Sequence, residues 1–214
     1  MISKQAHLNW QDSDLELLPQ RALWLADTGL LLVADLHLGK AESFQASGIP
    51  LPSDGDLSNL NALLELAAQL RPERVVVLGD LIHSRFGLTA ELREKIRALP
   101  ELLGCALELI GGNHDQGSWL EGLRASPPCR YGPLWLSHEP CTPDDPALLN
   151  VAGHVHPVTV LGHGADRLRL PCFALHQPQR QLLLPAFGSL TGGYAVSADH
   201  QRWVIADHNV LALP

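Results

Sequence analysis

The chain has 214 residues, of which 46% are hydrophobic and 18% are charged, so its composition is that of a folded domain and not of a disordered segment. Its 15 Lys and Arg residues against 23 Asp and Glu residues give a net charge of −8, which excludes a protein that coats nucleic acid by positive charge alone. The balance does not exclude a nuclease whose positive charge comes from bound metal ions.

The predicted elements of the first half alternate between strands and helices. Two strands, at 22–26 and 30–34, are joined by a turn at Asp27-Thr28-Gly29. A helix follows, with Leu57, Leu60, Leu64 and Ala67 at helical spacing and Ser53 or Asp54 as its cap. A buried strand at 74–78 precedes a helix at 89–99, which Thr89 caps and Pro100 ends, and then a strand at 107–110.

After Gly112 the pattern changes to strands with little helix between them. These strands are expected at 133–137, 150–152, 159–161, 168–175, 181–184 and 202–206. Strand–helix alternation followed by strands predicts an α/β sandwich. No linker, repeat or charge block divides the chain, so we expect one domain over residues 1–214.

We expect a cytoplasmic protein that does not associate with a membrane. The N-terminus has no apolar run behind its charge, and no stretch of about 18 apolar residues occurs, so neither a signal peptide nor a transmembrane helix is predicted. The four cysteines form no C-x-x-C pair, which favours reduced thiols.

Polar residues follow five successive predicted strands. They are Asp35-x-His37, Gly79-Asp80, Gly112-Asn113-His114-Asp115, Ser137-His138 and Gly153-His154-x-His156. The loops beyond the carboxyl ends of strands form the functional rim of an α/β sheet, and Gly lets the backbone turn sharply there. The D-x-H and H-x-H spacings would put alternate side chains on one side of an extended segment.

This mixture of residues suits a pair of divalent ions. Two ions about 3.5–4 Å apart clamp a phosphoryl group, and such a pair needs a bridging carboxylate, imidazoles and oxygen ligands. Each motif alone is an ordinary turn or a solvated histidine, whereas their conjunction at five strand ends predicts a metal centre.

The motif series resembles the calcineurin-like metallophosphoesterase superfamily. The resemblance implies a four-layer α/β/β/α sandwich with its site at the carboxyl ends of the strands. It also implies one metal held by Asp35, His37, Asp80 and His156 and a second held by Asp80, Asn113, His138 and His154, with Asp80 as the bridge. Mn²⁺ is expected from the resemblance, while the ligand types also suit Fe or Zn.

A finer resemblance extends over nearly the whole chain. The segments 35–40, 79–84, 169–173, 185–188 and 191–193 are similar to the PdeM branch, the bacterial ligase-associated DNA damage response endonucleases or phosphoesterases. This implies a role in DNA repair beside a DNA ligase, a helicase and an exonuclease-like protein. His83 departs from the Gly-Asp-x-x-Asp pattern of many superfamily members, and together with the compact Gly-x-x-His block it argues against a protein phosphatase.

Further site residues are predicted near these ligands. His114 follows Asn113 directly and is a candidate general acid; Asp115 either orients His114 or caps the turn. Lys40 and Arg85 either contact a substrate phosphate or are solvated loop residues. His83 either orients a ligand or lies near the substrate phosphate.

Three functions remain open at this point. The first is a two-metal phosphodiesterase or endonuclease acting on DNA. The second is a phosphoesterase of small molecules or nucleotides, although no cap insertion that would enclose such a substrate is evident. The third is a non-catalytic scaffold, which would not need His114 and a full ligand set.

Overall fold

The computed structural model of the chain describes residues 4–51, 54–115 and 123–214. Within them, the N-terminal half forms a seven-stranded sheet in the order β1-β2-β3-β4-β5-β6-β7. The strands are β1 (Ala6–Trp10), β2 (Ser13–Leu18), β3 (Ala22–Leu25), β4 (Leu30–Val33), β5 (Arg74–Leu78), β6 (Ala106–Ile110) and β7 (Ala125–Ser126). Because β4, β5 and β6 pair in parallel, their carboxyl ends lie at one edge.

The second sheet has nine strands among the described residues, in the order β14-β11-β12-β13-β10-β9-β8, with β15 paired to β12 and β16 paired to β15. The strands are β8 (Cys129–Tyr131), β9 (Leu134–Ser137), β10 (Leu149–Ala152), β11 (Pro157–Leu161), β12 (Leu168–His176), β13 (Gln181–Leu183), β14 (Tyr194–Ala195), β15 (Gln201–Ala206) and β16 (Asn209–Ala212). β9 and β10 are parallel, so they too end at a common edge.

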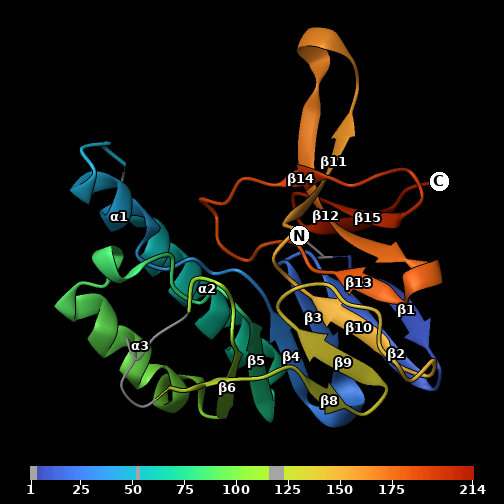
Figure 1. Cartoon of the computed structure of the whole chain (residues 1–214), viewed down its shortest axis with the longest axis horizontal. Coiled ribbons are helices and arrows are strands. Elements are labelled where there is room, and N and C mark those ends of the chain that lie inside the picture. Colours follow the sequence, from blue (N-terminus) through green and yellow to red (C-terminus); the bar gives the residue numbers. More distant parts are fainter. Residues whose placement is uncertain (1–3, 52–53, 116–122) are drawn as a thin grey trace.

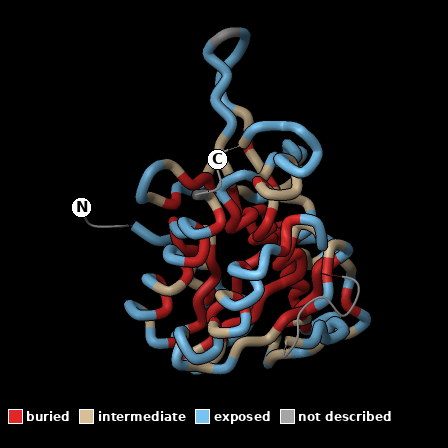
Figure 2. Tube along the Cα trace, turned by 90° about the vertical axis from the view of Figure 1, so that its left-hand side faces the viewer, coloured by how far each residue is buried: buried red, intermediate tan, exposed pale blue. Residues whose placement is uncertain are grey.

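The two sheets pack face to face, and helices cover the outer face of the first sheet (Figure 1). The helices are α1 (Lys40–Ala46), α2 (Asp54–Leu70) and α3 (Ala90–Leu103). Along β5, Val76 and Leu78 face the second sheet, whereas Val75 and Val77 face the helices. The strand is therefore buried on both faces, which explains its unbroken apolar run. Figure 2 shows this buried interior in red.

The predicted α/β sandwich is confirmed, with one difference in its layers. Among the described residues, the outer face of the second sheet carries a small buried cluster of Ala152, Ala174 and Leu183 against Val155 and Val196. Within the described part of the chain, its helical segments are single 3-10 turns, so the expected second layer of α-helices is not formed there.

Other differences concern individual elements. The strands β1, β2, β7, β8, β14 and β16 and the helix α1 were not predicted. β1 has no fully buried residue and α1 buries only Ala41, so neither leaves a strong apolar pattern, and β7 and β14 have two residues each. Thr89 caps α3 as expected, its side chain accepting the Leu92 N–H at 3.1 Å. Pro100 does not end α3, because the helix continues to Leu103 and ends at Gly104 in a left-handed conformation.

Helix α2 begins at Asp54, and the predicted cap Ser53 lies outside the described residues. Its buried face contains Leu60, Leu63 and Ala67, whereas Leu57 is 46% exposed. No helix among the described residues has the length and apolar character needed to cross a membrane.

Candidate metal centre

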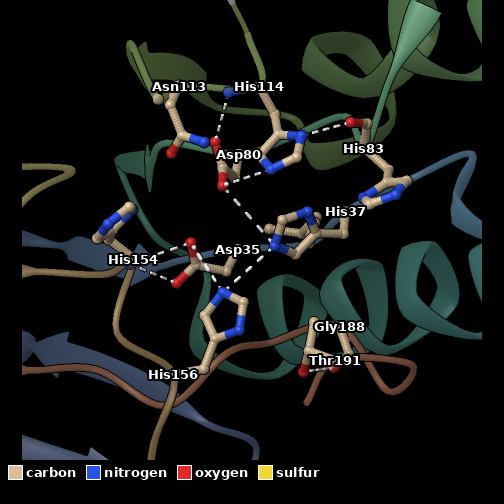
Figure 3. A network of polar contacts seen from close by, with 12 residues as sticks. Asp35, His37, Asp80, His83, Asn113, His114, His154, His156, Gly188 and Thr191 are labelled. Atoms are coloured by element: carbon tan, nitrogen blue, oxygen red, sulfur yellow. Dashed lines mark hydrogen bonds and ion pairs between the residues drawn. The ribbon is translucent and has the colours of Figure 1, made fainter. Parts of the chain in front are cut away.

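The predicted ligands meet where the two sheets share an edge. Asp35 and His37 follow β4, Asp80 follows β5, Asn113 follows β6, His138 follows β9, and His154 and His156 follow β10. Figure 3 shows the labelled members of this set converging from separate elements. The strand-end argument thus leads to one cluster of side chains.

Asp35 organises one half of the cluster. Its two carboxylate oxygens accept the His154 backbone N–H at 3.1 and 3.0 Å. Asp35 Oδ1 lies 3.4 Å from His156 Nε2, and His156 Nε2 lies 3.3 Å from His37 Nε2. One oxygen and two nitrogen atoms thus face a common point.

Asp80 lies between this group and a second one. Its Oδ2 lies 3.8 Å from His37 Nε2, while its Oδ1 lies 3.5 Å from His138 Nε2. Around His138 Nε2 are also Asn113 Oδ1 at 2.9 Å and His154 Nδ1 at 3.1 Å. The carboxylate therefore faces imidazoles on both sides.

The residues present fit a metal because acceptor atoms face one another. His138 donates from Nδ1 to the Leu78 carbonyl at 3.0 Å, and His156 donates from Nδ1 to the Gly192 carbonyl at 3.2 Å. In a neutral imidazole this leaves a lone pair on Nε2, aimed here at carboxylates and other nitrogens. Ligands held about 2.1 Å from one ion lie about 3 Å apart, so a cation satisfies this arrangement.

The protonation states of His37 and Asp80 also suit a bound cation. Burial, followed by the neighbouring His156, lowers the pKa of His37 to about 2, so its ring is neutral, as a metal ligand must be. Burial also raises the pKa of Asp80, since its negative charge is poorly solvated. Ligand atoms of Asp35, His37 and His156, and those of Asp35, Asp80 and His138, lie within 4.8 Å of one another.

The backbone at five of the predicted ligands lies in the left-handed region. Asp35, His37, Asp80, His154 and His156 all have a positive φ between 49° and 65°. The expectation that D-x-H and H-x-H lie on extended segments is therefore wrong, since the chain turns at each ligand in the left-handed region. Such conformations cost about 1–3 kcal/mol each and typically persist at functional sites.

Two glycines permit close approach of the ligands. A Cβ on Gly79, which has a φ of +77°, would lie 2.2 Å from His138 Nδ1. A Cβ on Gly112 would lie 2.3 Å from Asp80 Oδ1. The Gly residues before the polar motifs thus let ligands from neighbouring loops pack against the backbone.

His114 lies at the rim of the cluster. Its backbone N–H donates to Asp80 Oδ1 at 3.0 Å, and its Nδ1 donates to the His83 carbonyl at 2.6 Å. Nε2 then faces the cluster, 3.9 Å from Asp80 Oδ2. Asp115 instead accepts the backbone N–H groups of Gly112 and Ile82, at 3.1 and 3.3 Å, which is the geometry of a loop cap.

The three predicted substrate contacts have different surroundings. The His83 ring lies 5.5 Å from that of His37 and 5.2 Å from that of His114. Lys40 begins α1, and burial lowers its pKa. Arg85 is exposed, with its guanidinium carbon 4.7 Å from the centre of the Phe86 ring.

The supporting carbonyl groups were not predicted. Gly192 orients His156, and the segment before it docks beside the Asp35 loop through hydrogen bonds from Phe187 N to Ala34 O and from Gly188 N to Asp35 O. Backbone acceptors carry no sequence signal of their own. The sequence indicated these segments only through the family resemblance at 185–188 and 191–193.

Comparisons with known proteins identify the family of the chain. The sequence profile of the calcineurin-like phosphoesterase family matches residues 29–206. The crystal structure of the Pseudomonas putida nuclease MPE matches with 30% identity and a TM-score of 0.80, covering 98% of this chain and 100% of that chain. No curated protein sequence matches the chain significantly.

A Vps29 double mutant from Entamoeba histolytica has 13% identity and a TM-score of 0.37, over 86% of this chain and 96% of that one. This similarity is too low to bear on fold or function. The profile match and the full-length match at 30% identity confirm the predicted superfamily and its PdeM-like character. The chain belongs to the calcineurin-like phosphoesterase family and is a metal-dependent hydrolase.

Proposed function

We propose that the protein is a two-metal phosphodiesterase that cleaves DNA as an endonuclease. The observation that carries the proposal is the Asp80 carboxylate, which faces His37 on one side and His138 on the other. A carboxylate between two groups of ligands is what a pair of bridged ions requires. Similarity to a nuclease over the full chain supports a phosphodiester substrate.

Two ions are assigned to the two sides of Asp80. Asp35, His37, Asp80 and His156 would hold one, and Asp80, Asn113, His138 and His154 would hold the other. Mn²⁺ is the proposed metal, and the oxygen and imidazole donors also suit Fe or Zn. When bound, such a pair supplies a nucleophile at neutral pH and offsets charge on the phosphoryl oxygens.

The protein side chains then handle the leaving group and the substrate. Protonated His114, whose Nδ1–H donates to the His83 carbonyl, gives the proton on Nε2 to the leaving oxygen and is left as a neutral imidazole. Asp115 acts by fixing the loop that carries His114, a positioning role supported by its two backbone contacts. Lys40, His83 and Arg85 are proposed to contact substrate.

The biological setting is proposed from the PdeM-like character of the chain. DNA repair beside a DNA ligase, a helicase and an exonuclease-like protein is consistent with a nuclease of this type. Four free cysteines support a cytoplasmic location. We treat residues 1–214 as one domain, because both sheets share the core between them.

Hydrolysis of bis-p-nitrophenyl phosphate and p-nitrophenyl phosphate by the Mn²⁺-loaded protein tests the proposed reaction. We expect activity that EDTA removes and a higher kcat/KM for the diester. Preference for the monoester would favour a small-molecule phosphoesterase instead. Absence of turnover with either substrate, in protein shown to contain metal, would favour a scaffold.

A further inference from the structure

A hollow lies beside the metal centre, on the far side of His83. We name it the Phe44–Phe86 groove; its walls are Phe44, Ile49, His83 and Phe86, with Ser43 and Ser84 contributing hydroxyl groups. Its volume is about 480 Å³, within the roughly 300–1,000 Å³ typical of small-molecule sites. None of its described lining residues is acidic.

The groove is a formed feature of the fold. Ser43 Oγ and Ser84 Oγ hydrogen-bond at 2.6 Å and link α1 to the single-turn helix η2 (Arg85–Gly87). The His83 N–H donates to the Leu38 carbonyl at 2.8 Å, so the two loops also join through their backbones. Its rims are nevertheless apolar and open, with Phe86 70% exposed and Ile49 48% exposed. These exposed apolar side chains at the rim of a hollow leave the groove accessible from solvent.

A row of stacked aromatic rings extends from the groove to His114 beside the metal centre. Phe44 and His83 stack with their centroids 6.0 Å apart and planes 20° apart, and His83 stacks on His114 at 5.2 Å and 21°. His83 therefore lines the groove and also contacts the proposed general acid.

The positive charge around the groove suits a nucleotide. The Arg85 guanidinium lies over the Phe86 ring, which places a cation against the outer aromatic wall. Lys40 provides a second cation on the side facing the metal centre. A nucleotide combines the flat apolar base that the rings accept with the phosphate that the cations attract.

We propose that the Phe44–Phe86 groove binds an unpaired nucleobase next to the phosphate held in the metal centre, with the base stacking on Phe86 and Phe44. The inference rests on the proposed phosphodiesterase function and adds the part of the substrate that is recognised. A base paired within a duplex is already stacked, so it reaches the groove only when unpaired. Recognition by stacking is tolerant of sequence, because every base has an aromatic face.

The test compares two decamers of equal charge. One is oligodeoxythymidylate, and the other has the same backbone with every base replaced by an abasic tetrahydrofuran unit. We expect wild-type protein to prefer the thymidylate decamer about 5–20-fold in kcat/KM, and Phe86→Ala to reduce that preference to near unity. Phe86→Trp retains a stacking ring and should restore it. Leu102→Ala, which removes a 60% exposed side chain on α3, is the matched control and should leave the preference intact.

Fluorescence anisotropy with both decamers, in Ca²⁺ buffer without turnover, gives the dissociation constants as a second readout. We expect wild-type protein to bind the thymidylate decamer more tightly than the abasic decamer by a similar factor. Equal ratios for wild type and Phe86→Ala would overturn the groove assignment, as would wild-type protein that hydrolyses methyl p-nitrophenyl phosphate but neither decamer. Failure of wild-type protein to hydrolyse any diester would instead refute the proposed function. In that case the anisotropy ratio still decides whether the groove binds a base.

Discussion

Replacing Asp80 by Asn is expected to abolish tight metal binding and to lower phosphodiester hydrolysis by on the order of 10³-fold. Asn keeps the shape of the side chain and can still accept the His114 N–H, which Asp80 Oδ1 receives at 3.0 Å. It lacks the negative charge that faces His37 and His138. Metal assistance contributes several kcal/mol, and about 1.4 kcal/mol corresponds to each tenfold change in rate.

The same variant separates a ligand role from a structural one. Burial raises the pKa of Asp80, and the Asp35 carboxylate adds to that effect, so the ionised group is unfavourable in the metal-free protein. Metal-free Asp80→Asn should therefore unfold at a temperature equal to or above that of the metal-free wild type. Added Mn²⁺ should raise the unfolding temperature of the wild type alone. A variant that unfolds at a lower temperature without metal, yet still binds Mn²⁺, would contradict the assignment of Asp80 as a bridging ligand.

Replacing His114 by Ala is expected to leave metal content unchanged and to lower kcat on an oligonucleotide by about 10²–10⁴-fold, the usual contribution of a general acid. The ring contacts the site through Nε2, 3.9 Å from Asp80 Oδ2, while its hydrogen bond from Nδ1 goes to the His83 carbonyl. The backbone N–H that contacts Asp80 remains in the variant.

The leaving group provides the control for this variant. The oxygen leaving from DNA is a sugar alkoxide, which needs a proton, whereas p-nitrophenolate departs readily without one. The loss of activity in His114→Ala should therefore be much smaller on bis-p-nitrophenyl phosphate than on DNA. An equal loss on both substrates, or a loss of bound metal, would assign His114 to the metal centre and not to proton transfer.

The central strands of the first sheet and the residues of the metal centre could be predicted from the sequence, because burial imposes recognisable patterns on it. β4 and β5 are buried on both faces, so their sequences are continuous apolar runs, and a polar residue after such a run marks the strand end. α1 gave no such signal, because only Ala41 is buried. The continuation of α3 past Pro100 depends on the packing of Leu99 and Leu103 against the core, which local sequence does not reveal.

The geometry of the cluster was less predictable than its members. The left-handed backbone at Asp35 and His154 is uncommon for residues other than glycine, although Asp and His adopt it more readily than most. It is held by contacts from other loops, such as the hydrogen bond from Asp35 N–H to Gly79 O. The Phe44–Phe86 groove also had no sequence signature. Its two aromatic residues belong to different elements and meet only when the fold is complete.

The number of metal ions bound per chain tests the central claim most directly. Wild-type protein equilibrated with Mn²⁺, freed of excess metal by gel filtration and measured by inductively coupled plasma mass spectrometry, should contain two ions per chain. Two ions are predicted because ligand atoms gather on both sides of Asp80. A wild-type protein that retains one ion or none, while still hydrolysing phosphodiesters, would contradict the two-metal account.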